Sequence, residues 1–239
     1  RKLPLLLLGI LIFLNAQSQK TIIWCGNLID GQADEAKANM TILLEGNKIV
    51  GVEKGFSKAG TNDKVIDLKS KTVMPGWIDM HVHFEFETNP NAYLEKFTQN
   101  PADIAYQSIR FADTTLMIGF TTARDLGGSG VNISLRNAIN KGWLKGPRIY
   151  TAGRSIATTG GHADPTNGYR KDLAGDPGPL DAVANGADEC RKAVRQRYKE
   201  GSDLIKITAT GGVLSVAKSS SNPQFMDDEL EAIVKTAKD

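Results

Sequence analysis

Strand-like and helix-like stretches alternate along the chain from Pro75 to its last residue. Such alternation is typical of βα units in a parallel sheet, because parallel neighbours need a crossover connection, usually a helix, between them. We expect four strands, the first leading into His81 and the others at 119–128, 147–154 and 203–212. Helices are expected at 91–117 (broken near Pro101), 133–144, 186–201 and 227–238, the last with Asp227 as its N-cap.

Four consecutive βα units make half of a (β/α)8 barrel, a fold that runs to about 250 residues. The chain has 239 residues, begins with Arg rather than Met and stops inside an expected helix. The sequence therefore predicts an α/β protein of which this chain is a truncated piece, with the first half of a TIM-like barrel at 76–239. A complete flavodoxin-like domain of four or five strands is the alternative architecture.

The segment at 19–75 has a different pattern and is expected to form an antiparallel β unit of its own. Its β-rich runs are at 21–25, 40–45 and 48–53, and a strand pair is expected within 64–76. The four residues at 45–48 place Gly and Asn at the centre of a hairpin turn.

The first 18 residues resemble a signal peptide rather than part of the fold. Arg1 and Lys2 are followed by an apolar run at 5–14 and by a small-x-small site that ends at Ser18. The apolar run is shorter than the roughly 20 residues that span a bilayer. We expect export to the periplasm or the medium without a stable membrane anchor, and an uncleaved tethering helix is the alternative.

Composition argues against a nucleic-acid-binding protein and against a fold held together by disulfides. The formal net charge is only +2, and no basic run is interleaved with aromatic residues, so a nucleic-acid partner is not expected. Cys25 and Cys190 are too few for a disulfide framework and form no Cys-x-x-Cys pair. The sequence leaves a homo-oligomer open.

Two of the three histidines, His81 and His83, stand one residue apart at the end of the first barrel strand. Residues i and i+2 of a strand point to the same side, so both imidazoles can reach one metal ion. Functional groups of parallel βα folds gather at this end of the strands. An accidental pair on a strand edge is the alternative.

Lys206 lies among Leu204, Ile205 and Ile207 on the expected fourth strand, which should be buried on both faces. A buried ammonium tends to lose its proton or to find a partner. The neutral amine can react with carbon dioxide, and the resulting carbamate could bridge two divalent cations. Pairing with an aspartate or glutamate inside the barrel is the alternative.

Four stretches together, "MPGWIDMHVHFE", "GFTTARDLGG", "AGRSIATTGGHADP" and "DLIKITATGG", resemble the amidohydrolase superfamily. The resemblance runs from about Thr21 to the end of the chain and is closest to the imidazolonepropionase-like and Xaa-Pro dipeptidase (prolidase-like) branch. The unit at 19–75 resembles the first part of the small composite β-sandwich domain that flanks the barrel there.

The resemblance implies that His81 and His83 bind the first metal ion and that carboxylated Lys206 bridges two zinc ions. It also implies two histidine ligands on strands five and six and a catalytic aspartate on strand eight, which would lie beyond residue 239. His162, in a Gly-Gly-His stretch, is expected to contact substrate or to support a ligand, unless it is simply a solvent-exposed loop residue. Arg124 is expected to support the site in an ion pair with Asp125.

The resemblance therefore implies a metal-dependent hydrolase that cleaves an amide bond, with two divalent ions, zinc foremost, and carbon dioxide as cofactors. An exported dipeptidase acting on Xaa-Pro or hydrophobic dipeptides is the first expectation, and the present piece alone should be inactive. The alternatives are an imidazolonepropionase-like cyclic amidohydrolase, a hydrolase with a single metal ion, and a catalytically silent exported barrel that binds a ligand or metal.

Overall fold

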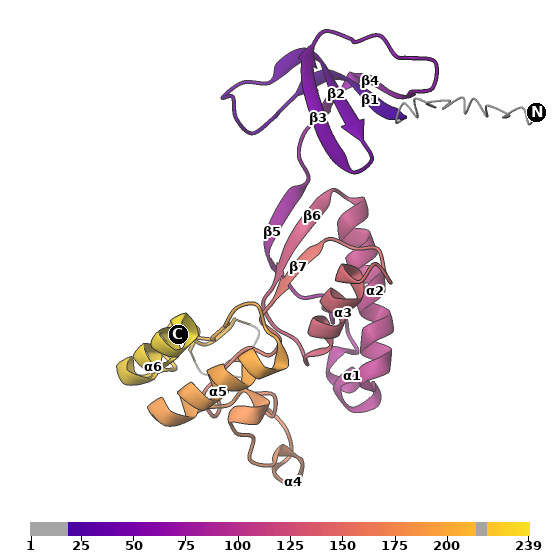
Figure 1. Ribbon diagram of the computed structural model, residues 1–239. Helices are drawn as coiled ribbons and strands as arrows, with labels where there is room; N and C mark the ends of the chain where they lie inside the picture. The colour runs from indigo at the N-terminus through magenta and orange to yellow at the C-terminus, as the bar shows by residue number, and fades with distance from the viewer. Residues whose placement is uncertain (1–18, 214–218) are drawn as a thin grey trace, which may run out of the picture. The chain divides into compact units, whose positions relative to one another are not determined.

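The computed structural model describes residues 19–213 and 219–239, drawn in colour in Figure 1. The chain divides between Pro75 and Gly76 into two compact units, each described by itself below. The expected signal peptide lies outside the described residues. In the two described ranges, no helix is both long enough and apolar enough to cross a membrane.

The first unit is a four-stranded sheet with the strand order β3-β2-β1-β4. β1 pairs antiparallel with β2 and parallel with β4, and β2 pairs antiparallel with β3. The sheet is therefore mixed, and the expectation of an all-antiparallel unit with a strand pair in 64–76 was wrong, because that segment forms one long strand beside β1. The strands are β1 (Lys20–Leu28), β2 (Lys37–Glu45), β3 (Lys48–Lys54) and β4 (Lys64–Val73).

Apolar residues of β1 and β2 form the core of this sheet. Cys25 and Leu28 of β1 pack with Met40 and Ile42 of β2, and all four side chains are buried. The expected hairpin turn joins β2 to β3, with Gly46 at a φ of 58°. Glycine suits that position because residues with a Cβ atom rarely adopt positive φ.

The second unit begins with three parallel strands in the order β5-β6-β7, as the βα pattern predicted. Figure 1 shows α2 and α3 lying along this sheet. Ala112 of α2 and Leu135 of α3 pack against Ala123 and Ile149 of the strands. The elements are β5 (Trp77–Val82), α1 (Ala92–Thr98), α2 (Pro101–Met117), β6 (Phe120–Asp125), α3 (Val131–Asn140) and β7 (Arg148–Thr151).

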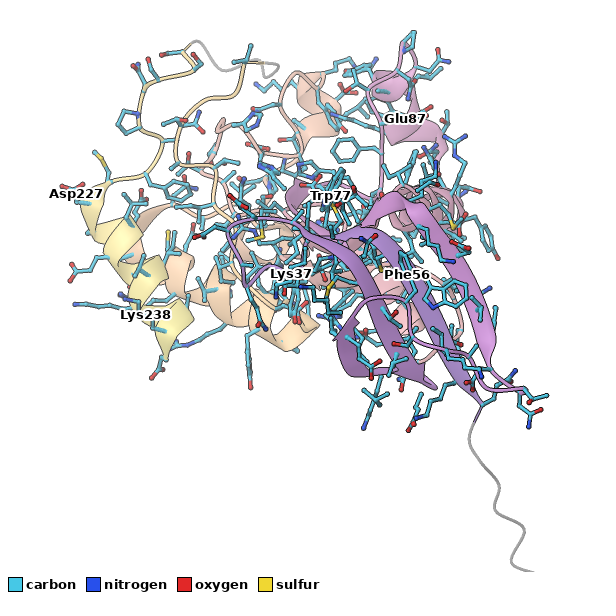
Figure 2. The ribbon with its side chains drawn as sticks, turned by 90° about the horizontal axis from the view of Figure 1, so that it is seen from above. Lys37, Phe56, Trp77, Glu87, Asp227 and Lys238 are labelled. Carbon is cyan, nitrogen blue, oxygen red and sulfur yellow. The ribbon has the colours of Figure 1, made fainter. Side chains whose placement is uncertain are left out.

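The remaining helices are α4 (Lys171–Ala174), the short 3₁₀ helix η1 (Pro179–Asp181), α5 (Gly186–Glu200) and α6 (Asp227–Lys238). α5 and α6 lie side by side over a core that includes Cys190, Ala193 and Ile233. The N-cap of α6 is Met226 rather than Asp227. Asp227, labelled in Figure 2, is the first residue of the helix. The Met226 amide donates to the Glu229 carboxylate at 2.7 Å, so Glu229 rather than Asp227 satisfies the free helix end.

The expected fourth strand at 203–212 is not a regular strand. It makes only isolated bridges, Ile156 with Ile207 and Thr210 with Pro223. The carboxylate of Asp203 accepts the Thr151 amide at 2.8 Å, where a continuous strand would offer a backbone carbonyl. The segment therefore runs beside the residues that follow β7 and brings Lys206 next to Ile156, whose amide donates to the Lys206 carbonyl at 2.8 Å.

Candidate metal centre

His81 and His83 lie on one side of the chain at the carboxyl end of β5. Their ring centroids are 5.4 Å apart, and both side chains are exposed, whereas Val82 between them packs against the core under the sheet. The strand geometry thus separates two polar rings from one apolar side chain, as the period of a strand requires. Two neighbouring imidazoles in this arrangement can serve as nitrogen ligands of one metal ion.

The ring of His83 is held by a backbone hydrogen bond. Its Nδ1 lies 2.8 Å from the carbonyl oxygen of Gly127, in the loop that follows β6. Because a carbonyl only accepts, Nδ1 carries the hydrogen and Nε2 is left with its lone pair for a ligand. The ring of Phe86 stacks on the ring of His83, with the two centroids 5.2 Å apart.

Lys206 and Arg124 lie close enough to His81 to act on its charge. Partial burial lowers the pKa of His81, and the electrostatic effects of Lys206, His83 and Arg124 lower it further, against the opposing effect of Asp79. Partial burial also lowers the pKa of the Lys206 ammonium, and Arg124 adds to that effect. Both changes favour the neutral nitrogen, which binds a metal ion or reacts with carbon dioxide.

The donor set fits part of a metal centre. In the described portion of the chain, no three side chains of His, Cys, Asp or Glu are grouped to hold a metal ion. His81 and His83 supply two nitrogen donors, and Lys206, which lies near His81, becomes an oxygen donor only when it is carboxylated. The assignment of these three residues as metal ligands stays a prediction, and Lys206 is half-buried rather than buried on both faces as expected.

Arg124 and Asp125 do not form the expected ion pair in the described structure, because neighbours on a strand point to opposite faces. The Arg124 guanidinium donates to the Met80 carbonyl at 2.8 Å. Asp125 is completely buried and accepts the Gly127 amide at 3.1 Å and the Asn132 side chain at 3.0 Å. Burial raises the pKa of the Asp125 carboxyl, and these hydrogen bonds oppose the shift.

His162 lies in the loop after β7, with an exposed side chain. Its backbone amide donates to the side chain of Gln224 at 2.8 Å, and its ring lies directly against Gly212, where a Cβ atom would overlap the ring. This loop and the stretch that follows Lys206 are therefore in contact. The role of His162 toward substrate stays a prediction, as does that of Arg124.

Comparison with known proteins now decides the family. The sequence profile described as the Amidohydrolase family matches residues 72–239, most of the chain. The chain belongs to the amidohydrolase family. Members of this family are in general metal-dependent, in accord with the donor set at the end of β5.

Three similar proteins indicate which members of the amidohydrolase family this chain resembles. A crystal structure of a Xaa-Pro dipeptidase with bound methionine is 50% identical, with a TM-score of 0.85, over 92% of this chain and 54% of that one. A prolidase complexed with N-methylphosphonate-L-proline is 35% identical, with a TM-score of 0.78, over 92% and 54%. The ochratoxinase of Aspergillus niger is 30% identical over 92% of this chain and 48% of its own.

The chain spans about half the length of these relatives. The resemblance to the prolidase-like branch is confirmed, and so is the α/β fold class, because the similar solved structures are amidohydrolase TIM barrels.

Two residues of this amidohydrolase chain that lie shortly after the histidine pair, Glu85 and Phe86, were not predicted from the sequence to belong to the site. Phe86 stacks on His83, as described above. Glu85 is only 5% exposed, and its carboxylate accepts the backbone amides of Ser129 and Asn132 at 2.5 and 2.7 Å. The available signal was an ionisable residue next to an apolar one, Phe84, shortly after the end of β5, and the structure buries both.

Proposed function

We propose that the whole protein to which this chain belongs is a metal-dependent hydrolase that cleaves the amide bond of dipeptides. Xaa-Pro and hydrophobic dipeptides are the proposed substrates. The observation that carries the proposal is the 50% identity to a Xaa-Pro dipeptidase over 92% of the chain, which includes the histidine pair and Lys206. The similarity to a prolidase with a bound proline phosphonate supports the same substrate class.

In this proposal, His81, His83 and carboxylated Lys206 would hold two divalent ions, with zinc as the proposed metal. Two such ions, when bound, supply an ionised water at neutral pH and polarise the scissile carbonyl. His83 presents Nε2 because Gly127 fixes the hydrogen on Nδ1. The amine nitrogen of Lys206 forms a bond to the carbon of carbon dioxide and releases a proton, which leaves a carbamate with one negative charge.

Arg124 has a supporting role in the proposal. Its positive charge acts on Lys206 and disfavours the ammonium form of that side chain. The same charge would favour the anionic carbamate that replaces the ammonium. His162, positioned by Gly212 and Gln224, is proposed to contact substrate.

The test is a substrate panel on the purified whole protein, supplied with zinc and bicarbonate. Xaa-Pro and hydrophobic dipeptides should be hydrolysed, and the His81→Asn and Lys206→Ala variants should lose the activity. Lys199→Ala, which changes an exposed lysine on α5, is the matched control and should remain active. Full metal loading without dipeptide hydrolysis would contradict the proposal.

The same panel separates the rival functions. Turnover of imidazolonepropionate alone would indicate a cyclic amidohydrolase. Ochratoxin belongs in the panel because the Aspergillus niger relative is an ochratoxinase. A protein that binds one ion and still hydrolyses dipeptides would be a mononuclear hydrolase, and a protein without any turnover would be a silent barrel.

We also propose that the protein is exported through cleavage after residue 18. The support is the charged start, the apolar run and the small residues before Gln19 in the sequence. Amino-terminal sequencing of the protein recovered from outside the cytoplasm should begin at Gln19. Recovery with the apolar run intact would contradict cleavage.

A further inference from the structure

Glu85 connects the strand that bears the histidines to the beginning of α3. Its two carboxylate oxygens accept the amides of Ser129 and Asn132, the second of which lies in the first turn of α3. The N-cap residue of this helix is Gly130, which has no side chain that could accept these amides. Glu85 therefore supplies the missing cap from another element, and its negative charge suits the positive end of the helix dipole.

Asp125 makes a second connection to the same stretch. The amide of Phe84 donates to the Asp125 carboxylate at 3.2 Å, while the Asn132 side chain donates to its other oxygen at 3.0 Å. Asn132 also reaches the Gly153 carbonyl at 3.2 Å. Residues 84 and 85 are thus tied through buried groups to the loops that follow β6 and β7.

These connections leave His83 little freedom, since the two residues after it are anchored while its ring is bonded to Gly127. The packing around Glu85 is equally tight, because a Cβ atom at Gly128 would overlap the Glu85 carboxylate. No cation is paired with the Glu85 carboxylate among the ion pairs of the described residues. Among the described residues, the Glu85 carboxylate thus accepts hydrogen bonds only from backbone amides.

We propose that Glu85 is a positioning residue for His83, holding the ring so that Nδ1 donates to Gly127 and Nε2 is left free to bind a metal ion. The inference rests on the proposed function only in taking His83 as a metal ligand. It assigns the site a buried carboxylate that touches neither metal nor substrate and acts through the backbone between residues 83 and 85.

The first test uses the metal-free whole protein. Imidazole nitrogen NMR shifts should show one tautomer of His83, with the hydrogen on Nδ1, and the signal is assigned by its loss in His83→Asn. Glu85→Gln and Gly128→Ala should both return the ring to a mixture of tautomers, since the first weakens the acceptor and the second displaces it. A ring already mixed in the wild type overturns the proposal.

The second test is zinc affinity, measured by competition with a chelator at a temperature where every variant is folded. Loss of a group that orients a ligand typically weakens metal binding about 10–100-fold. We expect this range for Glu85→Ala and Gly128→Ala, with partial recovery in Glu85→Gln, which keeps one acceptor oxygen. If Glu85→Ala does not fold, the other two variants still decide the matter.

Glu87→Ala is the matched control, because Glu87 lies in the same stretch but is exposed and pairs only with Arg110 among the described residues. It should leave zinc affinity and the His83 ring signals unchanged. Variants of Glu85 that fold with a lower melting temperature but wild-type ring signals and zinc affinity would show a purely structural cap and overturn the proposal. Failure of the proposed function is a separate result, namely a wild-type protein that binds zinc and hydrolyses no dipeptide.

Discussion

The ring nitrogen Nδ1 of His83 lies 2.8 Å from the carbonyl oxygen of Gly127, across 44 positions of the chain. This contact joins the ends of β5 and β6 and fixes which nitrogen of the histidine is free. The orientation of one proposed metal ligand is therefore set by the backbone of a neighbouring loop.

Substitution of Gly127 by alanine should damage both the loop and the histidine. Gly127 has a φ of 145°, and a Cβ atom there would overlap the hydroxyl of Ser155. We expect the free energy of unfolding to fall by at least about 1 kcal/mol and zinc affinity to fall with it. Gly130→Ala is the control, since it has a φ of 105° but open space around it. Urea unfolding and chelator competition measure the two effects, and equal zinc affinity in both variants would contradict the prediction.

Gly212→Ala should act through His162. The new Cβ atom would overlap the His162 ring and force it to move. If that ring contacts substrate, KM should rise in Gly212→Ala and in His162→Ala. The double variant should have the same KM as His162→Ala alone, because the ring that Gly212→Ala would displace is already absent. Additive increases in KM would show that Gly212 acts independently of the His162 ring.

Lys206→Ala should prevent loading of a second metal ion. The variant lacks the amine that forms the bridging carbamate, so metal content should fall from two ions to at most one ion per chain. Bicarbonate should raise the metal content of the wild type and leave the variant unchanged. Elemental analysis with Lys199→Ala as control measures this, and unchanged occupancy in Lys206→Ala would refute the bridge.

Asp203→Ala should destabilise the second unit. Asp203 accepts the Thr151 amide and pairs with Arg136 at 2.6 Å, where the two side chains are 11% (Arg136) and 30% (Asp203) exposed. Hydrogen bonds to charged groups contribute about 1.5–3 kcal/mol each, so the free energy of unfolding should fall by about 2 kcal/mol or more. Asp181→Ala breaks a more exposed pair and should cost at most about 1 kcal/mol. Denaturant titrations of both variants provide the comparison, and equal losses would count against the role of Asp203.

Cys190 should make stability depend on alkaline pH. Burial raises the pKa of this thiol to about 11, and the nearby carboxylates of Glu229, Asp228 and Glu189 add to the effect. The unfolded chain loses the proton near its ordinary pKa while the folded chain keeps it, so stability falls as pH rises from about 9 to about 11. The fall in stability over this pH range should be absent in Cys190→Ala. The free energy of unfolding is measured for both proteins over this pH range, and the same pH dependence in both would contradict the raised pKa.

Much of the fold follows from local patterns. The alternation of strand-like and helix-like stretches predicted the parallel strands β5, β6 and β7 and the helices between them, because parallel neighbours need a crossover connection. The break before Pro101 was also predictable, since proline suits the first turn of a helix and disfavours a helical residue before it. The irregular course of 203–212 was not, because it depends on the Asp203 carboxylate replacing a backbone acceptor for Thr151.

The candidate site shows the same division. The spacing of His81 and His83 determines that both rings share a side, and the amidohydrolase motifs determine the family. Only the tertiary structure brings Lys206 and Arg124 to His81 and points Glu85 at the beginning of α3. The physical reason is range: side-chain direction along a strand is a property of neighbouring residues, whereas the partner of a buried charge is chosen by which distant backbone amides the packing leaves unsatisfied.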